Sequence, residues 1–221
     1  MNTIPSRSTF DLSLYLVLDP EMCGGVAGMA RVTEAAINGG VSIVQLRALE
    51  WRKRAFWEAA RALQPLCRAR DVPFIINDHV DVALAIDADG VHVGQKDLPA
   101  KEARRLLGEN KIIGVSVSNA QQWREAETGT ADYIGVGPVW LTPTKPEAGP
   151  ALGVDGLRSL IASMKSQGST MRTLAIGGIN VNNARSVMQT AGVDGIAVVS
   201  AICANGAPEE AARALCEVIE S

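Results

Sequence analysis

The chain has 221 residues, of which 47% are hydrophobic and 20% are charged. Its 21 basic and 24 acidic side chains give a formal net charge of −3. This composition is too apolar for a disordered chain, and it lacks the basic excess typical of nucleic-acid-binding proteins. No apolar run reaches the roughly 18 residues that a transmembrane helix needs. We therefore expect neither a nucleic-acid partner nor a membrane span.

Cysteine and histidine usage argues against a zinc site. Cys23, Cys67, Cys203 and Cys216 lie far apart without a CxxC pair, and the chain has 2 histidines. Scattered thiols are typical of a reduced, cytoplasmic protein in which the cysteines are buried. Residues 1–12 show no signal-peptide pattern, and we expect them to form an N-terminal extension.

Short apolar runs alternate with longer amphipathic segments along the chain. The predicted strands are Leu14–Leu18, Ser42–Leu46, Pro73–Ile76, Gly90–Val93, Ile112–Val115, Tyr133–Val136, Thr173–Ile176 and Gly195–Val198. The predicted helices are Gly28–Asn38, Arg52–Arg70, Val80–Ile86, Ala100–Leu107, Ala120–Thr128, Gly156–Met164, Asn182–Thr190 and Pro208–Ile219.

Strands that alternate with helices imply right-handed βαβ units and a parallel sheet. Eight units in 221 residues give 221/8, or about 28 residues each, which suits a compact barrel. The strands are almost continuously apolar, as expected when both faces of a sheet are buried. We predict an α/β fold, a single (β/α)8 TIM barrel over residues 1–221. The alternative, an open doubly wound sheet, rarely holds so many units in this length.

Residues 137–154 interrupt this alternation. The segment contains four prolines, Pro138, Pro143, Pro146 and Pro150, and it follows neither a helical nor a strand period. Long irregular loops in compact domains usually carry function. We predict an active-site loop, with a plain surface insertion as the alternative.

The carboxyl ends of the strands carry the chemistry in barrels of this kind. Gln45 and Arg47 end the second strand, and their spacing places both side chains on one side of it. A buried arginine requires an anionic partner. An anionic ligand would supply that partner, and a structural ion pair is the alternative.

Asp78 and Asp97 follow the third and fourth strands. Two carboxylates near an arginine suit Mg²⁺, which takes oxygen ligands and bridges to substrate phosphates. For each aspartate the alternative is a helix N-cap. His79 either supports Asp78 or opens a helix, and His92, inside a strand, is expected to be structural.

Hydroxyl groups and an ammonium follow the fifth and sixth strands. Ser116 ends the fifth strand, within a segment where a serine could also cap the next helix. Thr142, Thr144 and Lys145 lie in the long loop, where they could clamp an anion.

Two small-residue segments follow the seventh and eighth strands, Gly177–Gly178 and Val199–Ser200. Loops at these positions form the usual phosphate site of such barrels, although a tight turn would also explain the glycines. Together with the preceding residues they predict two anion sites. One is glycine-based and suits a monophosphate, and the other combines Arg47, Lys145 and Mg²⁺ and suits a diphosphate.

The order and spacing of these segments resemble the thiamine-phosphate synthase family over nearly the whole chain. The motifs are YLVLD (Tyr15–Asp19), GGVSIVQLR (Gly39–Arg47), FIINDHVDVAL (Phe74–Leu84), DGVHVGQKD (Asp89–Asp97), GVSVS (Gly114–Ser118), DYIGVGPVWLTPTK (Asp132–Lys145), IGGI (Ile176–Ile179) and VSAI (Val199–Ile202).

This resemblance implies an enzyme that joins a hydroxymethylpyrimidine diphosphate to a thiazole phosphate, with release of diphosphate through a pyrimidine cation. It implies a Mg²⁺ cofactor, bound by Asp78 and Asp97. The implied contacts to the pyrimidine diphosphate come from Gln45, Arg47, Asn77 and Lys145, with Ser116 near the reacting groups and Arg47, Lys145 and Ser116 catalytic. The implied contacts to the thiazole phosphate and the lid come from Thr142, Thr144, Gly178, Val199 and Ser200.

One position departs from the family pattern Gln-x-Arg-x-Lys. Leu49 replaces the lysine, which helps to bind the diphosphate in the family. Arg52, Lys53 or Arg54 are the nearby substitutes, although a solvated helix start would also explain them. We expect weaker diphosphate affinity.

Several other functions compete with this interpretation. A related thiazole tautomerase would need a histidine where this chain has Ser118, and it would not need Asp78, Asp97 and Lys145. A non-catalytic phosphate-ligand sensor would not need these three residues either. Indole-glycerol-phosphate synthases and sugar-phosphate epimerases would show lysine–glutamate or histidine sets that are missing here. The oligomeric state stays open, a homo-oligomer included.

Overall fold

The computed structural model describes residues 10–142, 144 and 149–220. Eight strands form a closed barrel in chain order, from β1 to β8, and β8 pairs with β1. The strands are β1 (Leu14–Leu18), β2 (Ile43–Leu46), β3 (Phe74–Asn77), β4 (Gly90–Val93), β5 (Ile112–Val117), β6 (Tyr133–Val136), β7 (Arg172–Ile176) and β8 (Gly195–Val198). All neighbours are parallel, which confirms the predicted (β/α)8 barrel.

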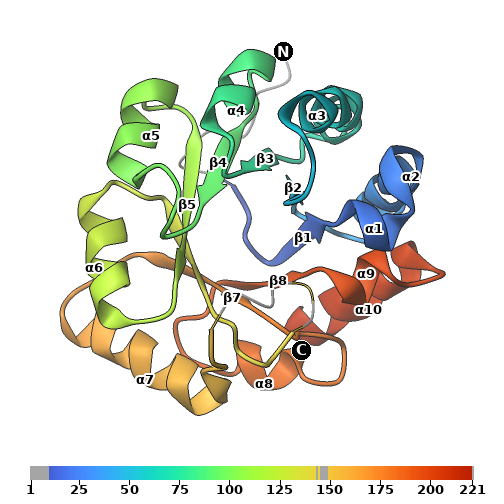
Figure 1. Cartoon of the computed structure of the whole chain (residues 1–221). Helices are drawn as coiled ribbons and strands as arrows, with labels where there is room; N and C mark the ends of the chain where they lie inside the picture. The colour runs from blue at the N-terminus through green and yellow to red at the C-terminus, as the bar shows by residue number, and fades with distance from the viewer. Residues whose placement is uncertain (1–9, 143, 145–148, 221) are drawn as a thin grey trace.

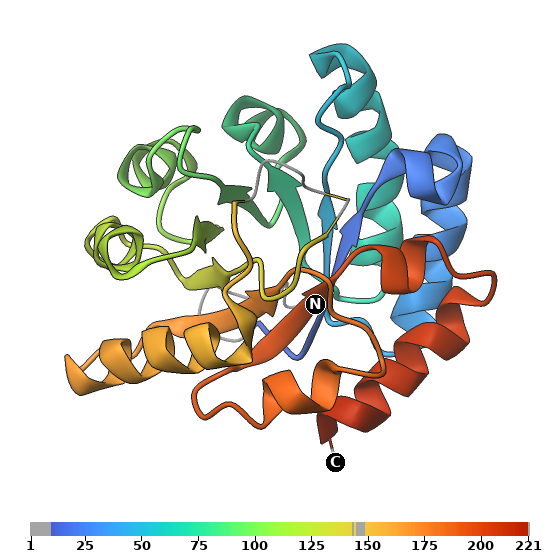
Figure 2. The same cartoon turned by 60° about the horizontal axis from the view of Figure 1, so that its bottom comes forward.

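The helices lie outside the ring of strands, as Figures 1 and 2 show. They are α1 (Pro20–Cys23), α2 (Gly25–Asn38), α3 (Lys53–Arg68), α4 (Val80–Ile86), α5 (Ala100–Leu107), α6 (Ala120–Thr128), α7 (Gly153–Ser166), α8 (Ala184–Met188), α9 (Ser200–Cys203) and α10 (Pro208–Glu220). No described helix is long and apolar enough to cross a bilayer.

Caps explain where the structure departs from the predicted boundaries. The Asp19 side chain accepts from the amides of Glu21 and Met22 and starts the short helix α1. Gly24 then adopts a left-handed φ of 77° that ends α1 and allows α2 to begin at Gly25. The first long helix therefore starts earlier than its apolar pattern indicates.

Two apolar clusters lie on the two faces of the strands. The inner cluster contains Tyr15 and Val17 of β1, whereas the outer cluster contains Leu14, Leu16 and Leu18 of the same strand. Successive side chains of a strand point to opposite faces. Every second residue of a strand therefore points into the barrel, and the residues between them face the helices.

The amino-terminal end of the barrel is closed by residues expected to belong to an extension. Phe10 and Leu12 are 4% and 0% exposed and pack in the inner cluster. The Arg172 guanidinium lies 4.4 Å from the Phe10 ring centroid and donates to the Phe10 carbonyl at 2.9 Å. These apolar side chains therefore seal the barrel interior at this end.

A buried ion pair joins α5 to the start of β6. Arg104 Nη2 lies 2.6 Å from Asp132 Oδ2, and both side chains are 6% exposed. The same carboxylate oxygen accepts from the Ile113 amide at 2.8 Å, and Arg104 also donates to the carbonyls of Gly108 and Lys111. The pair thus satisfies polar groups that the helix and strand ends leave without partners.

We predict that Arg104→Met lowers the free energy of unfolding by about 3–5 kcal/mol, because it leaves the Asp132 carboxylate buried without its cation. The matched control is Arg105→Met on the same helix. Its pair with Glu102 is 70% and 43% exposed, so its loss should cost less than about 1 kcal/mol. Urea unfolding of both variants checks the difference, and equal losses would contradict it.

Candidate active site

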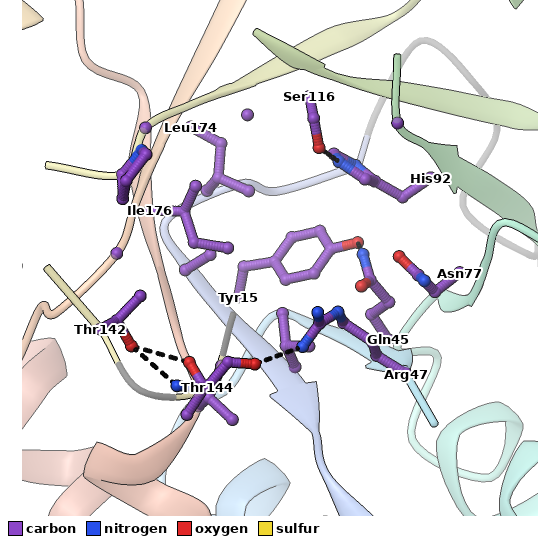
Figure 3. Close-up of a pocket in the computed structure, with 18 of the residues that line it drawn as sticks. Tyr15, Gln45, Arg47, Asn77, His92, Ser116, Thr142, Thr144, Leu174 and Ile176 are labelled. Atoms are coloured by element: carbon purple, nitrogen blue, oxygen red, sulfur yellow. Dashed lines mark hydrogen bonds between the residues drawn. The ribbon is translucent and has the colours of Figure 1, made fainter. Parts of the chain in front are cut away.

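A pocket of about 430 Å³ opens at the carboxyl end of the barrel. Ligand sites commonly have volumes of about 300–1,000 Å³. All of the predicted site residues that the structure describes line it: Gln45, Arg47, Asn77, Asp78, Asp97, Ser116, Thr142, Thr144, Gly178, Val199 and Ser200. Lys145 lies outside the described residues. Figure 3 shows how the labelled side chains converge on this space.

Arg47 links the end of β2 to the long loop. The side chains of Gln45 and Arg47 continue the inward face of the strand, and the two residues are 4% and 8% exposed. Arg47 Nη1 donates to the Thr144 carbonyl at 2.9 Å (Figure 3). This bond orients the guanidinium at the pocket wall.

Asp78 occupies a strained turn directly after β3. Its φ is +60°, and the His79 amide donates across it to the Asn77 carbonyl at 2.7 Å. A three-residue turn with positive φ is rare and strained, and such strain is concentrated at functional sites. The Asn77 side-chain amide donates to Asp78 Oδ2 at 2.7 Å and fixes the carboxylate.

Neither aspartate is a helix N-cap. His79 occupies the N-cap of α4 and Pro99 that of α5. Asp97 Oδ2 instead accepts from the Gly94 amide at 2.8 Å and closes the turn after β4. The capping explanation is therefore excluded for both carboxylates, which line one pocket.

The long loop, which connects β6 to α7 and carries the two pocket-lining threonines, continues along β7. The amides of Val139 and Trp140 donate to the carbonyls of Ile176 and Gly177 at 2.9 and 3.0 Å. Further along, the hydroxyls of Thr142 and Thr144 lie 2.8 Å apart.

The glycines after β7 have a structural reason of their own. Gly177 and Gly178 have φ of +109° and +66°, and a Cβ on Gly177 would lie 2.6 Å from Pro138 Cβ. A Cβ on Gly178 would lie 2.8 Å from Trp140 Cβ. The pair therefore admits the close approach of the loop, whether or not a ligand binds there.

Sequence reasoning missed the position of His92. Its ring nitrogens lie 3.0 Å from Tyr133 Oη and 3.0 Å from Ser116 Oγ, and the residue lines the pocket. Tyr133 also contacts Tyr15 Oη at 2.8 Å, and Tyr15 accepts from Gln45 Nε2 at 2.8 Å. Strand alternation could have indicated these contacts, because each of these residues occupies an inward-facing position of its strand.

The pKa values of the two tyrosines are raised. For Tyr15 burial is the main cause, partly offset by hydrogen bonds with Tyr133 and Gln45. For Tyr133 burial again dominates, and proximity to Tyr15 adds to it. Both phenols therefore remain protonated beside the pocket.

Two of the three basic residues near Leu49 contact acidic side chains instead of the pocket. Lys53 Nζ lies 2.7 Å from Asp81, and Arg54 Nε lies 3.0 Å from Glu58. Leu49 itself is 52% exposed and lines the pocket.

Lys96 is a cation that the sequence analysis gave no role. It is exposed and lines the pocket beside Asp97. Among the described lining residues, Arg47 and Lys96 carry the positive charges.

We predict that Gly177→Ala destabilises the protein by about 2 kcal/mol or more, because strain at positive φ adds to a clash with the loop. Gly168 is the matched control. Its φ is +80° and a Cβ there would meet nothing within 4 Å, so Gly168→Ala should cost about 1 kcal/mol from strain alone. Urea midpoints of the two variants give the comparison, and an equal effect would show that the loop yields without cost.

Known proteins resemble this chain over nearly its full length. The thiamine-phosphate synthase of Laribacter hongkongensis is 53% identical over 95% of this chain and 96% of its own. That of Syntrophomonas wolfei is 46% identical, with 95% and 97% covered. The solved thiamine phosphate pyrophosphorylase of Pyrococcus furiosus superposes with a TM-score of 0.83 at 37% identity, covering 95% of this chain and 96% of that one. A 3-hexulose-6-phosphate synthase from Salmonella typhimurium, at 20% identity and a TM-score of 0.69 over 95% and 99% of the two chains, shares the fold.

The family described as thiamine monophosphate synthase matches residues 14–202. This range runs from the first strand of the barrel to the helix that follows the last one. Fold, motif order and relatives agree over that range, and the chain belongs to the thiamine monophosphate synthase family.

Proposed function

We propose that this protein condenses 4-amino-2-methyl-5-hydroxymethylpyrimidine diphosphate with 4-methyl-5-(2-phosphoethyl)thiazole to form thiamine phosphate and diphosphate. The observation that carries the proposal is one pocket, in a chain of this family, lined by two cations and two carboxylates at neighbouring strand ends. Cations alone suit an anion, whereas cations with paired carboxylates suit a diphosphate bound with a metal ion. The remaining strand ends supply small and hydroxyl residues for a second phosphate.

The donor set at Asp78 and Asp97 fits Mg²⁺. Mg²⁺ usually takes one or two protein carboxylates, keeps several waters and binds substrate phosphates. No cluster of three or more acidic, histidine or cysteine ligands occurs among the described residues, so a protein-only metal cage is not found in that part of the chain. The strained backbone at Asp78 supports the same assignment. When bound, Mg²⁺ would neutralise charge on the diphosphate.

Arg47 and Lys96 would stabilise the departing diphosphate. As the bond from the pyrimidine methylene to oxygen breaks, negative charge grows on the leaving group, and a positioned guanidinium lowers the energy of that state. Arg47 is already oriented by its bond to the Thr144 carbonyl. Lys145 would add a third cation from the loop.

The reaction requires no strong enzymic base. The electron-rich aminopyrimidine carries the positive charge left on its methylene, and the thiazole nitrogen attacks that carbon with its own lone pair. This agrees with tyrosines that stay neutral beside the pocket and with carboxylates that would hold the metal. The protein would then mainly need to exclude water from the pyrimidine cation. The loop that carries Thr142 and Thr144 would shield the cation from water.

The thiazole phosphate would bind at Thr142, Thr144, Gly178, Val199 and Ser200. These residues lie on the long loop and after β7 and β8, whereas the aspartates follow β3 and β4. Different strands would then supply most of the contacts to the two anions.

A tautomerase function receives no support from Ser118. Its amide and hydroxyl both contact Gln122 Oε1, at 2.8 and 2.9 Å. A serine held by the next helix is unsuited to the proton transfer for which the tautomerase uses a histidine.

The test is a coupling assay on the full-length protein with both substrates and Mg²⁺. We expect thiamine phosphate to form with Mg²⁺ and not with EDTA. Asp97→Asn keeps the size of the side chain but removes its charge, and we predict a loss of about 100-fold or more in Mg²⁺-dependent kcat/KM.

Asp155→Asn is the matched control for Asp97→Asn, because Asp155 lies on α7 with a side chain that is 94% exposed. It should retain full activity. Product formation without Mg²⁺, or an unchanged Asp97→Asn enzyme, would contradict the metal assignment. Binding of thiazole phosphate without any coupling would support a sensor instead.

Leu49→Lys places a cation at the pocket wall, and we predict that it lowers the KM for the pyrimidine diphosphate about three- to ten-fold. Lys96→Met should raise that KM by a similar factor, since it removes a cation from the same wall. Lys101→Met on α5, also exposed, controls for loss of surface charge. Initial rates at saturating thiazole phosphate give these values, and no change in either pocket variant would show that the diphosphate binds elsewhere.

A further inference from the structure

Five side chains from five strands form a continuous hydrogen-bonded chain across the barrel. Gln45 Nε2 donates to Tyr15 Oη at 2.8 Å, and Tyr15 Oη lies 2.8 Å from Tyr133 Oη. Tyr133 Oη lies 3.0 Å from His92 Nδ1, and His92 Nε2 lies 3.0 Å from Ser116 Oγ. Gln45 and Ser116, the two ends, both line the pocket, whereas Tyr133 does not.

The hydrogen bonds of this chain run in one donor-to-acceptor direction, because the side-chain amide nitrogen of Gln45 can only donate. Tyr15 accepts from Gln45, and in the described part of the protein its hydroxyl proton has no acceptor besides Tyr133. Tyr133 must then donate its own hydrogen bond to His92 Nδ1.

A neutral imidazole that accepts at Nδ1 carries its proton on Nε2. In this tautomer the Nε2 proton is directed at Ser116 Oγ, 3.0 Å away. A hydroxyl that accepts in this way keeps its own proton for another partner, and Ser116 faces the pocket (Figure 3).

We propose that Tyr15, Tyr133 and His92 are positioning residues that fix the His92 tautomer and so direct the Ser116 hydroxyl proton at the bound pyrimidine diphosphate. The identity of the acceptor rests on the function proposed above. The direction of the chain does not, because it follows from the protein's own donors and acceptors.

Two glycines make room for this chain. A Cβ at Gly114 of β5 would lie 2.1 Å from Tyr133 Cζ and 2.5 Å from His92 Nδ1. A Cβ at Gly135 of β6 would lie 3.2 Å from His92 Cε1. Any larger residue at Gly114 would separate Tyr133 from His92, so this inward position is left empty where the two rings meet.

Burial keeps both phenols of this hydrogen-bonded chain protonated. Tyr15 and Tyr133 are 1% and 0% exposed, and burial raises the pKa of each phenol. A neutral phenol retains its hydroxyl proton and can donate a hydrogen bond to the next acceptor. The Gly114 gap and the four distances thus fix the geometry of the hydrogen-bonded chain.

Nitrogen-15 NMR of the imidazole rings in the full-length protein tests the tautomer without any substrate. The chain has 2 histidines, so His79→Gln assigns the His92 signals. We expect His92 to be protonated on Nε2, and we expect Tyr133→Phe to shift the ring toward a mixture of tautomers. A proton on Nδ1 in the wild-type protein, or an unchanged tautomer in Tyr133→Phe, would overturn the proposal.

A double-mutant cycle tests whether Tyr133 acts through Ser116. Tyr133→Phe should lower kcat about ten-fold, the cost of one misdirected hydrogen bond, with an unchanged KM for the thiazole phosphate. In a Ser116→Ala background the same change should have no further effect. Additive losses would show that Tyr133 only stabilises the fold.

Two variants separate positioning from packing. Ser169 is not part of the hydrogen-bonded chain, and its buried hydroxyl contacts Trp123 Nε1 at 3.3 Å. Ser169→Ala should therefore lower the free energy of unfolding and leave kcat unchanged. His92→Gln, whose amide can donate to Ser116, should recover part of the activity that His92→Leu loses. If the wild-type protein forms no thiamine phosphate, the proposed function fails, while the NMR result still decides the direction of the chain.

Discussion

The closure of eight parallel strands is the constraint on which the rest of this structure depends. In a closed barrel every second residue points inward, so the inward positions of all strands share one narrow space. Here that space is filled by apolar side chains at the amino end, where Phe10 and Leu12 seal it, and by polar side chains above them. One core therefore supports the pocket from below, and Gln45, His92 and Ser116 are held by the strands themselves.

That arrangement limits the volume available to each layer. Tyr15, Tyr133 and His92 are large, and they fit at one level only because Gly114 and Gly135 contribute no side chains there. Glycine in the interior of a strand weakens that strand. Here the two glycines leave space in which Tyr133 contacts both Tyr15 and His92. His92 in turn contacts Ser116 at the pocket wall.

The cations of the pocket are held by different means. Arg47 is buried and tied to the Thr144 carbonyl, so part of its ordering entropy is lost before a ligand arrives. Lys96 is exposed and acts as a point charge on a flexible stem. Because position 49 is Leu49, the described residues supply one rigid and one flexible cation to the proposed diphosphate site. The nearby Lys53 and Arg54 contact acidic partners on the helices instead.

The sequence by itself determined the barrel and the strand ends. Apolar periodicity located the strands and helices because the buried faces of a parallel sheet need apolar runs, and the motif order indicated the family. It also indicated which polar residues follow each strand, because chain order alone places them at one end of a barrel. The roles of those residues stay predictions, and Lys145 lies outside the described residues.

Only the tertiary structure decided which groups meet. The contact of His92 with Tyr133 and Ser116 joins β4, β6 and β5, and no local pattern encodes a distance between strands. For the same reason the sequence did not predict the contacts of His92 or the position of Lys96 at the pocket. The strain at Asp78 likewise arises from its φ, which residue type does not specify. Side-chain contacts across a barrel depend on register and on space left by glycines, and both are properties of the closed sheet.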